Sequence, residues 1–147
     1  MDNPFIEIRP LTTDIVKNNV ASLIEMSKQL KGDYWTVEHY LSELNRKWEL
    51  SSAVFCDDEL CAFIINSEKG ESLHVHRIVV AKEFHNQGIG RKLIQKVMED
   101  AKRAGKNIVT LKAESDNPQS LGFYKSLGFE NVGAQDHLVL LTLKIAP

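Results

Sequence analysis

The stretch VVAKEFHNQGIGRKLI, residues 79–94, decides the fold. A strand-like apolar run ends at Val80, and Gly88 and Gly90 stand where an amphipathic helix begins. The first N–H groups of a helix have no partner within it and carry a partial positive charge, so glycines beside them leave room for an anion. Arg91 adds a positive charge at the same turn. The glycines would equally suit a helix that only packs closely on its strand, so both interpretations stand at this point.

The size and charge of the chain bound its class. Its 147 residues are enough to bury a core, and we expect residues 1–147 to form one domain. The formal net charge of -2 creates no overall field that would attract nucleic acid. No apolar run approaches the roughly 20 residues that cross a bilayer, and the first residues lack the features of a signal peptide. We therefore expect neither a nucleic-acid nor a membrane partner.

The chain has two cysteines, Cys56 and Cys61. They lack the paired spacing of a disulfide framework or a structural zinc site, and we therefore expect no metal. We predict that both are small buried apolar side chains in a reducing compartment. A cytoplasmic location follows from that expectation.

The periodicity of the remaining sequence predicts a single α/β (α+β) domain with the element order β-α-α-β-β-β-α-β-α-β-β. The predicted strands are residues 5–10, 52–56, 60–66, 72–80, 107–113, 129–133 and 137–145, and the predicted helices are residues 11–32, 36–48, 88–105 and 118–128. A helix joins strand 72–80 to strand 107–113, so these two strands are expected to be parallel neighbours with a right-handed crossover. The rest of the mixed sheet is expected to be mostly antiparallel.

Two motifs give this chain a resemblance to a known family. The spacing V-x-x-x-x-H-x-x-G-x-G is formed by Val80, His85, Gly88 and Gly90, and NPQSLGFYKSLGF follows at residues 117–129. Together, and with the element order of the whole chain, they resemble the GNAT superfamily of acetyl-CoA-dependent N-acetyltransferases. That family usually has Arg or Gln where this chain has His85. We expect weaker charge assistance and a retained site, since backbone N–H groups would do most of the binding.

The resemblance implies a GNAT-type sheet in which the parallel strands 72–80 and 107–113 splay apart, with acetyl-CoA in the gap as cosubstrate. The pantetheine arm is then expected along Ile78, Val79 and Val80, with Asn117 helping to hold it. The residues implied for the phosphates are His85, Asn86, Gln87, Gly88, Ile89, Gly90 and Arg91.

In the family a primary amine attacks the thioester directly. Tyr124 matches the residue that in this family usually donates a proton to the departing thiolate. It would also line the cofactor site. Its alternative role is that of an aromatic side chain in the core. His74 and His76 lie on the same side of strand 72–80 and are candidates for the base, because a histidine pKa near ~6.5 suits proton transfer. The segment 74–90 also resembles arylalkylamine N-acetyltransferases. Glu114 is an alternative base, and the histidines are otherwise buried polar groups; without a third ligand they do not make a zinc site.

The acceptor expected from the resemblance is a primary amine, with a small molecule favoured over a protein. Asp33, Tyr34 and Trp35 offer side chains that could enclose a cationic or aromatic amine. A protein N-terminal or lysine acetyltransferase, a non-catalytic acyl-CoA sensor and another type of nucleotide binder stay open as alternatives. Edge strands near the C-terminus often pair in this family, so a homodimer is a further expectation.

Overall fold

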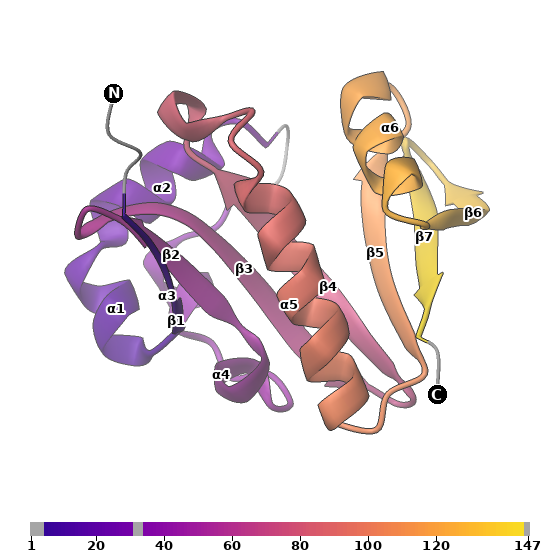
Figure 1. Cartoon of the computed structure of the whole chain (residues 1–147), viewed down its shortest axis with the longest axis horizontal. Helices are drawn as coiled ribbons and strands as arrows, with labels where there is room; N and C mark the ends of the chain where they lie inside the picture. Colours follow the sequence, from indigo (N-terminus) through magenta and orange to yellow (C-terminus); the bar gives the residue numbers. More distant parts are fainter. Residues whose placement is uncertain (1–4, 31–33, 146–147) are drawn as a thin grey trace.

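The computed structural model describes residues 5–30 and 34–145, and its centre is one mixed sheet in the order β1-β2-β3-β4-β5-β7-β6 (Figure 1). The strands are β1 Ile6–Pro10, β2 Ser52–Cys56, β3 Glu59–Lys69, β4 Ser72–Val80, β5 Ile108–Glu114, β6 Glu130–Gln135 and β7 Leu138–Lys144. The helices are α1 Thr13–Asn18, α2 Val20–Ser27, α3 Val37–Leu41, α4 Lys47–Leu50, α5 Ile89–Arg103 and α6 Pro118–Ser126. The seven strands follow one another along the chain as predicted, and β4 and β5 are parallel neighbours joined through a helix.

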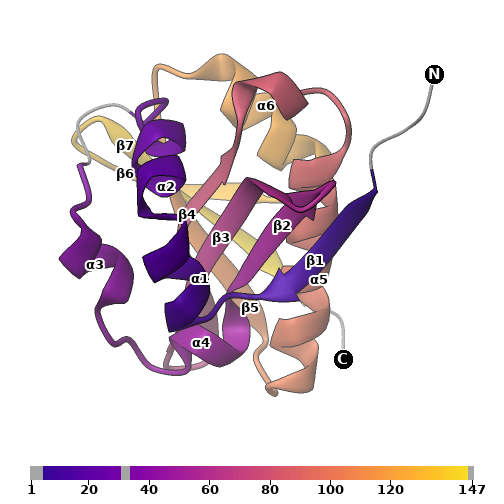
Figure 2. The same cartoon turned by 90° about the vertical axis from the view of Figure 1, so that its left-hand side faces the viewer.

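Helices cover both faces of the sheet. Helices α1, α2 and α3 lie on one face, and α5 and α6 lie on the other (Figure 2). Under α5, Leu93 and Ile94 pack with Leu73 of β4, and all three are fully buried. On the opposite face Tyr40 packs edge-on against Phe63 of β3, with ring centroids 5.8 Å apart. The sheet is therefore buried over its centre, which explains the nearly continuous apolar sequence of β3.

The joint between β4 and α5 forms as the sequence predicts. β4 ends at Val80, and α5 runs to Arg103, with Gly105 at φ +73° just beyond its last turn. β4 and β5 are parallel, but they pair only over Ser72–Val75 and Ile108–Leu111. Beyond these residues the strands have no register with each other, so the predicted splay is present.

The helix predicted for residues 11–32 is interrupted at Asn19, whose backbone angles are φ -131° and ψ 24°. Its side-chain Nδ2 donates to the carbonyl of Ile15 at 2.8 Å and competes with the helical bonding pattern. Thr12 caps α1 by accepting from the N–H of Ile15 at 3.1 Å. The predicted end of this helix, Gly32, lies outside the described residues.

The helix predicted for residues 36–48 is also divided, into α3 and α4, because Lys47 folds back onto the end of α3. The fully buried Lys47 ammonium donates to the carbonyls of Tyr40 and Ser42, each at 2.7 Å. Two carbonyls at a helix end thereby gain partners that a continuing helix would have supplied. Arg46, just before Lys47, takes the left-handed conformation at φ 57°.

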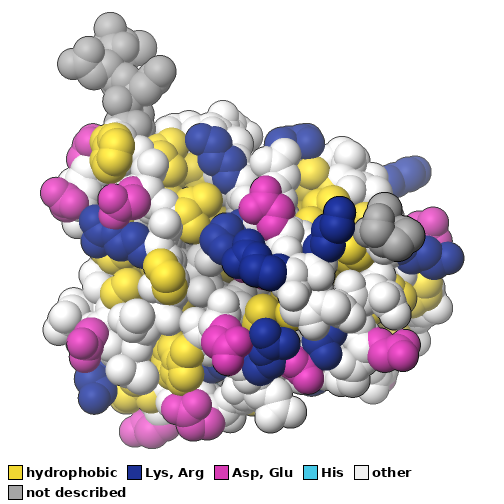
Figure 3. Space-filling model, turned by 60° about the horizontal axis from the view of Figure 1, so that its bottom comes forward, with side chains coloured by type: hydrophobic (Ala, Val, Ile, Leu, Met, Phe, Trp, Pro, Cys, Tyr) yellow, Lys and Arg dark blue, Asp and Glu magenta, His cyan; other side chains and the backbone are white. Residues whose placement is uncertain are grey.

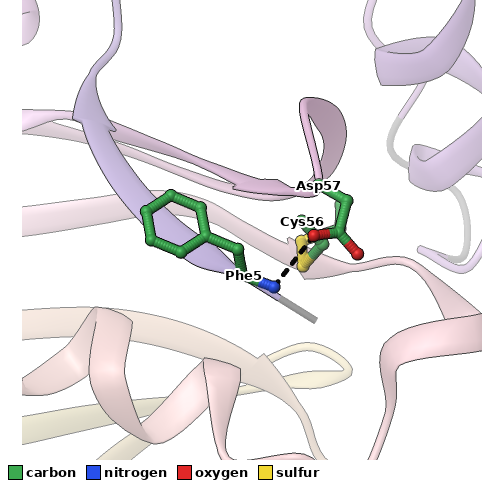
Figure 4. Close-up of a disulfide and its surroundings, with 4 residues drawn as sticks. Phe5, Cys56 and Asp57 are labelled. Carbon is green, nitrogen blue, oxygen red and sulfur yellow. Dashed lines mark hydrogen bonds between the residues drawn. A yellow bond between two sulfur atoms is a disulfide. The ribbon is translucent and has the colours of Figure 1, made fainter. Parts of the chain in front are cut away.

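The prediction of two unpaired cysteines was wrong: Cys56 and Cys61 form a disulfide (Figure 4). Asp57 and Asp58, both at positive φ, make a tight turn that sets the two cysteines diagonally across the β2–β3 hairpin, with their Cα atoms 6.0 Å apart. Figure 4 also shows the N–H of Phe5 donating to Asp57 Oδ1 at 3.0 Å. The pairing removes the cysteine argument for a reducing compartment.

The face shown in Figure 3 carries Lys and Arg side chains with Asp and Glu side chains between them. Glu68, near the end of β3, forms ion pairs with Arg46 at 3.1 Å and with Lys106 at 3.2 Å. Within residues 5–30 and 34–145, no helix is long and apolar enough to cross a membrane. The same residues contain no group of three or more His, Cys, Asp or Glu placed to hold a metal ion.

Candidate functional site

A bulge in β4 positions the polar side chains of the site. Ile65 of β3 is opposite Arg77, but Asn66 is opposite Val75, so His76 is an extra residue on β4. Leu73 and Val75, before the bulge, pack in the core under α5, whereas Val79, after it, packs in the core under α1 and α2. The bulge therefore turns the strand over between Val75 and Arg77.

Three polar side chains of β4, those of His74, His76 and Arg77, gather on the face that α3 covers. The rings of His74 and His76 lie 4.8 Å apart, which agrees with the prediction that they share a side. The Arg77 guanidinium stacks on the Trp35 ring at 4.4 Å and is 3% exposed. Nothing in the alternation of the sequence indicated that Arg77 would join the histidines.

Among the residues that the structure describes, His74 and His76 each have one polar side-chain partner. His76 Nε2 lies 2.6 Å from Ser67 Oγ, and His74 Nδ1 lies 2.7 Å from Thr110 Oγ1. Burial is the main cause that lowers the pKa of both rings to about 4, and nearby cations add to the effect. Both histidines are therefore neutral at pH 7.

Backbone groups of β4 face the gap to β5. Ala81 N–H donates to Cys61 on β3 at 2.8 Å, and the direction of these groups alternates along a strand. The N–H and carbonyl groups of Ile78 and Val80 therefore point away from β3 and into the gap, whereas Val79 pairs with Phe63 of β3. The Val80 carbonyl accepts from Gln29 Nε2 at 3.0 Å and from His85 Nε2 at 2.8 Å. The N–H groups of Ile78 and Val80 and the carbonyl of Ile78 are then the backbone groups of this segment that can bind a ligand.

The two glycines at the start of α5 have different physical roles. Gly88 is the N-cap of α5 at φ 79°, and a Cβ added to it would meet nothing within 4 Å. Glycine is required there by the backbone conformation, and the space in front of it is open. A Cβ on Gly90 would lie 3.2 Å from Cζ of Phe123, so Gly90 permits α5 to approach α6. Close packing is thus the observed role of Gly90, and the open space at Gly88 leaves the room that anion binding would need.

Helix α6 supplies two predicted residues to the gap. Asn117 is its N-cap and accepts from the Ser120 N–H through Oδ1 at 3.1 Å. Tyr124 is 9% exposed and packs edge-on against Phe123 and Phe129. Burial raises the pKa of Tyr124 to about 12, so its hydroxyl stays protonated at pH 7.

Two adjoining pockets fill the gap between β4 and β5. The first, which we call the loop pocket, has a volume of about 440 Å³ and lies at the glycine turn. Its lining includes Ile78, Val79, Val80, His85, Asn86, Gly88, Ile89, Gly90, Arg91, Asn117 and Tyr124. Of the residues predicted for the cofactor, Gln87 alone is not part of this lining.

The second, which we call the inner pocket, has a volume of about 210 Å³. His76, Arg77, Lys112, Glu114 and Tyr124 are among its lining residues. Gln29, Leu30, Ile78, Asn117, Ser120 and Tyr124 line both pockets, so the two meet at these residues.

The structure thus brings together His76, Glu114 and Tyr124 of the predicted catalytic set and leaves His74 outside both linings. Sequence reasoning missed Arg77 and Lys112. A charged residue inside the apolar run of β4 was the available signal for Arg77.

Of the residues expected to enclose the acceptor, Trp35 stacks on Arg77, and the Tyr34 residue is 81% exposed. Asp33 lies outside the described residues. Gln29, which lines both pockets, carried no sequence signal.

Comparisons with known proteins agree with this geometry. The sequence profile of the acetyltransferase (GNAT) family matches residues 20–129. An uncharacterized N-acetyltransferase of Methanocaldococcus jannaschii is 44% identical over 77 residues, which are 52% of this chain and 33% of that protein. N-alpha-acetyltransferase 30 of Dictyostelium discoideum is 30% identical over 131 residues, which are 86% of this chain and 69% of that protein.

Among solved structures, the PaiA N-acetyltransferase of Thermoplasma acidophilum in complex with coenzyme A superposes with a TM-score of 0.81 at 21% identity. The match covers 95% of this chain and 99% of that chain. For several curated relatives, the matched segment spans only about a third of their length, from 31% to 33%. The profile match and the similarity along most of the Dictyostelium protein show that the chain belongs to the GNAT family of acetyltransferases.

Proposed function

We propose that this protein is an acetyl-CoA-dependent N-acetyltransferase that moves the acetyl group to the primary amine of a small molecule by direct attack in a ternary complex. The observation that carries the proposal is the meeting of two pockets in the split between β4 and β5, with Tyr124 in the lining of both. One pocket can hold the cofactor while the other holds the amine, and transfer takes place where they meet.

The loop pocket fits coenzyme A in its polar groups. The first N–H groups of α5, next to Gly88, and the Arg91 side chain offer an anion site for the pyrophosphate. The N–H groups of Ile78 and Val80 face the gap and can bond the pantetheine amides or the acetyl oxygen. Because the Val80 carbonyl already accepts from Gln29 and His85, we assign pantetheine binding to these N–H groups and to the carbonyl of Ile78.

In the proposed reaction the amine nitrogen bonds to the acetyl carbonyl carbon, the C–S bond breaks, and the electron pair leaves on sulfur. A thiolate whose conjugate acid has a pKa of about 8.5 is a weaker base than a phenolate whose conjugate acid has a pKa of about 12. Tyr124 is therefore assigned to hold the developing thiolate by a hydrogen bond while keeping its own proton. The proton that finally neutralises the thiolate comes from the attacking ammonium.

An alkylammonium with a pKa of about 10.4 must lose a proton before its nitrogen can attack. Two inner-pocket groups are available as acceptors at pH 7, directly or through a water. His76 is neutral there because burial lowers its pKa to about 4, and Glu114 brings a carboxylate to the same pocket. The pH profiles of kcat/KM for Glu114→Gln and His76→Gln separate the two candidates. The base is the residue whose substitution flattens the rise of kcat/KM with pH.

A small acceptor is favoured by the volume of the inner pocket, about 210 Å³. A protein N-terminus is the second candidate, favoured by the 30% identity to the N-alpha-acetyltransferase of Dictyostelium discoideum over 86% of this chain. Peptides of increasing length, assayed beside the small amines, distinguish the two candidates. If the acceptor is a protein N-terminus, turnover persists when residues are added after the first one; if it is a small molecule, turnover is lost.

The test is release of free thiol from acetyl-CoA over a panel of small amines, amino acids and N-terminal peptides. We expect turnover with one class and a loss of about 100-fold in kcat for Tyr124→Phe, because a hydrogen bond to a charged thiolate is removed. Ser126→Ala, which removes an exposed hydroxyl from the same helix outside both pocket linings, is the control and should keep wild-type kcat. Acetyl-CoA binding without turnover on any acceptor would refute catalysis and favour a sensor.

A further inference from the structure

One wall of the inner pocket carries two opposite charges side by side. Thr110, Lys112 and Glu114 share one face of β5, because Val109, Leu111 and Ala113 between them are buried under α5. Lys112 is exposed and Glu114 is half-buried, and both line the pocket. Among residues 5–30 and 34–145 neither side chain has a hydrogen bond or an ion pair. Their charges are therefore available to a ligand.

Glu114 and Lys112 give this wall one charge of each sign. Arg77 faces the wall from β4, but its guanidinium is already engaged, with the Trp35 ring at 4.4 Å among its contacts. Glu114 is the one carboxylate in the described lining of the inner pocket. A ligand with a positive and a negative group close together therefore matches the charges of Lys112 and Glu114 better than a ligand that carries a single sign of charge.

We propose that the acceptor is a small amine that also carries a carboxylate close to its nitrogen, as an α-amino acid does, with the amine at Glu114 and the carboxylate at Lys112. This inference rests on the proposed acetyl transfer and names its substrate class. Side chains two residues apart on a strand are separated by about 7 Å, and both lysine and glutamate can bend toward a ligand between them. Purely cationic acceptors such as polyamines are disfavoured because they would meet the Lys112 ammonium without offering it a partner.

The experiment compares three acceptors that differ only at the carboxylate: L-leucine, L-leucinamide and isopentylamine, with the corresponding methionine and phenylalanine sets beside them. Thiol release from acetyl-CoA gives kcat/KM for each. We expect each amino acid to exceed its amide by about tenfold, because the carboxylate gains a charged partner. Lys112→Met should abolish most of that ratio, mainly through KM. Lys144→Met should retain it, because Lys144 is an exposed lysine on the same face at the far end of β7.

Two results would overturn the inference in different ways. Amides or plain amines that react as well as the amino acids, with no change of the ratio in Lys112→Met, would refute the carboxylate site and leave acetyl transfer standing. Absence of turnover on every acceptor would refute the proposed function instead. Calorimetric titration of L-leucine into the protein saturated with CoA then decides the inference: binding that Lys112→Met weakens about tenfold supports it, and absence of binding refutes it.

Discussion

Acidification from pH 7.5 to pH 5 should destabilise the protein through His74 and His76. Both have a pKa of about 4 in the folded protein, because burial disfavours the charged ring, against about 6.5 in the unfolded chain. Above pH 6.5 both states are neutral and the histidines leave stability unchanged. Between pH 6.5 and pH 4 the unfolded chain binds protons that the folded protein does not, so stability falls as the pH falls.

The size of the effect follows from the same linkage. At pH 5 a single histidine with these pKa values costs at most about 2 kcal/mol relative to neutral pH. The two side chains are only partly buried, and halving the sum for solvent screening leaves about 2 kcal/mol for the pair. With a urea dependence of about 2 kcal/mol per molar, the unfolding midpoint should fall by about 1 M.

The assay is urea unfolding followed by the fluorescence of Trp35 and Trp48 at several pH values from 7.5 to 5. The lower limit avoids the carboxyl groups, most of which titrate near pH 4. Replacing both histidines by glutamine keeps a polar partner for Ser67 and Thr110 and should remove most of the pH dependence. His85→Gln, at an exposed position, should keep the wild-type profile. A double variant with the wild-type profile would refute the argument.

The turn before α5 and the hairpin disulfide give two further predictions. Gly88→Ala and Gly90→Ala should each lower the free energy of unfolding by about 1–2 kcal/mol, the first through left-handed backbone strain and the second through overlap with Phe123. Thermal unfolding measures both losses. Adding Phe123→Leu should restore the stability of the Gly90→Ala variant and leave the Gly88→Ala variant unchanged. Reduction of the Cys56–Cys61 bond should lower the free energy of unfolding by about 2 kcal/mol, the loop-closure entropy expected for a short loop. Urea unfolding midpoints with and without reductant measure this loss. An unchanged midpoint in the Cys56→Ser, Cys61→Ser double variant would show that the bond adds no stability.

Much of the fold was predictable because its signals are local. The apolar stripe of α5, the glycines around it and the strand before it each act within a few residues, and the structure has them where the sequence predicts. The breaks in the first two predicted helices depended on particular side chains. Asn19 bonds to the carbonyl of Ile15, and Lys47 reaches back to Tyr40 and Ser42. Helical periodicity continues through both positions and does not report such bonds.

The disulfide and part of the site depended on register, which a single sequence does not specify. The spacing of Cys56 and Cys61 fits a bond only when the turn has two residues and the strands pair as they do. Lys112 likewise lies in the site because of how β5 pairs with β4. The β4–β5 pairing ends at Leu111, one residue before Lys112, so Lys112 stands where the two strands separate. A pattern of alternating burial identifies the exposed face of β5 without indicating what lies across from it.

The bulge at His76 connects these features. In an unbroken strand, Leu73, Val75 and Arg77 would share a face, and Arg77 would be buried against α5. With one added residue, Arg77 turns to the face of the histidines, and the last β4–β5 pair, Val75 with Leu111, falls just before the bulge. Because helices cover both faces of β4, Leu73 and Val75 are buried on one face and Arg77 and Val79 on the other. Burial therefore still alternates residue by residue through the bulge, and the alternation does not reveal that the strand turns over. The splay that opens the inner pocket and the cation that lines it therefore have one structural origin, in a residue that the alternation of the sequence does not distinguish.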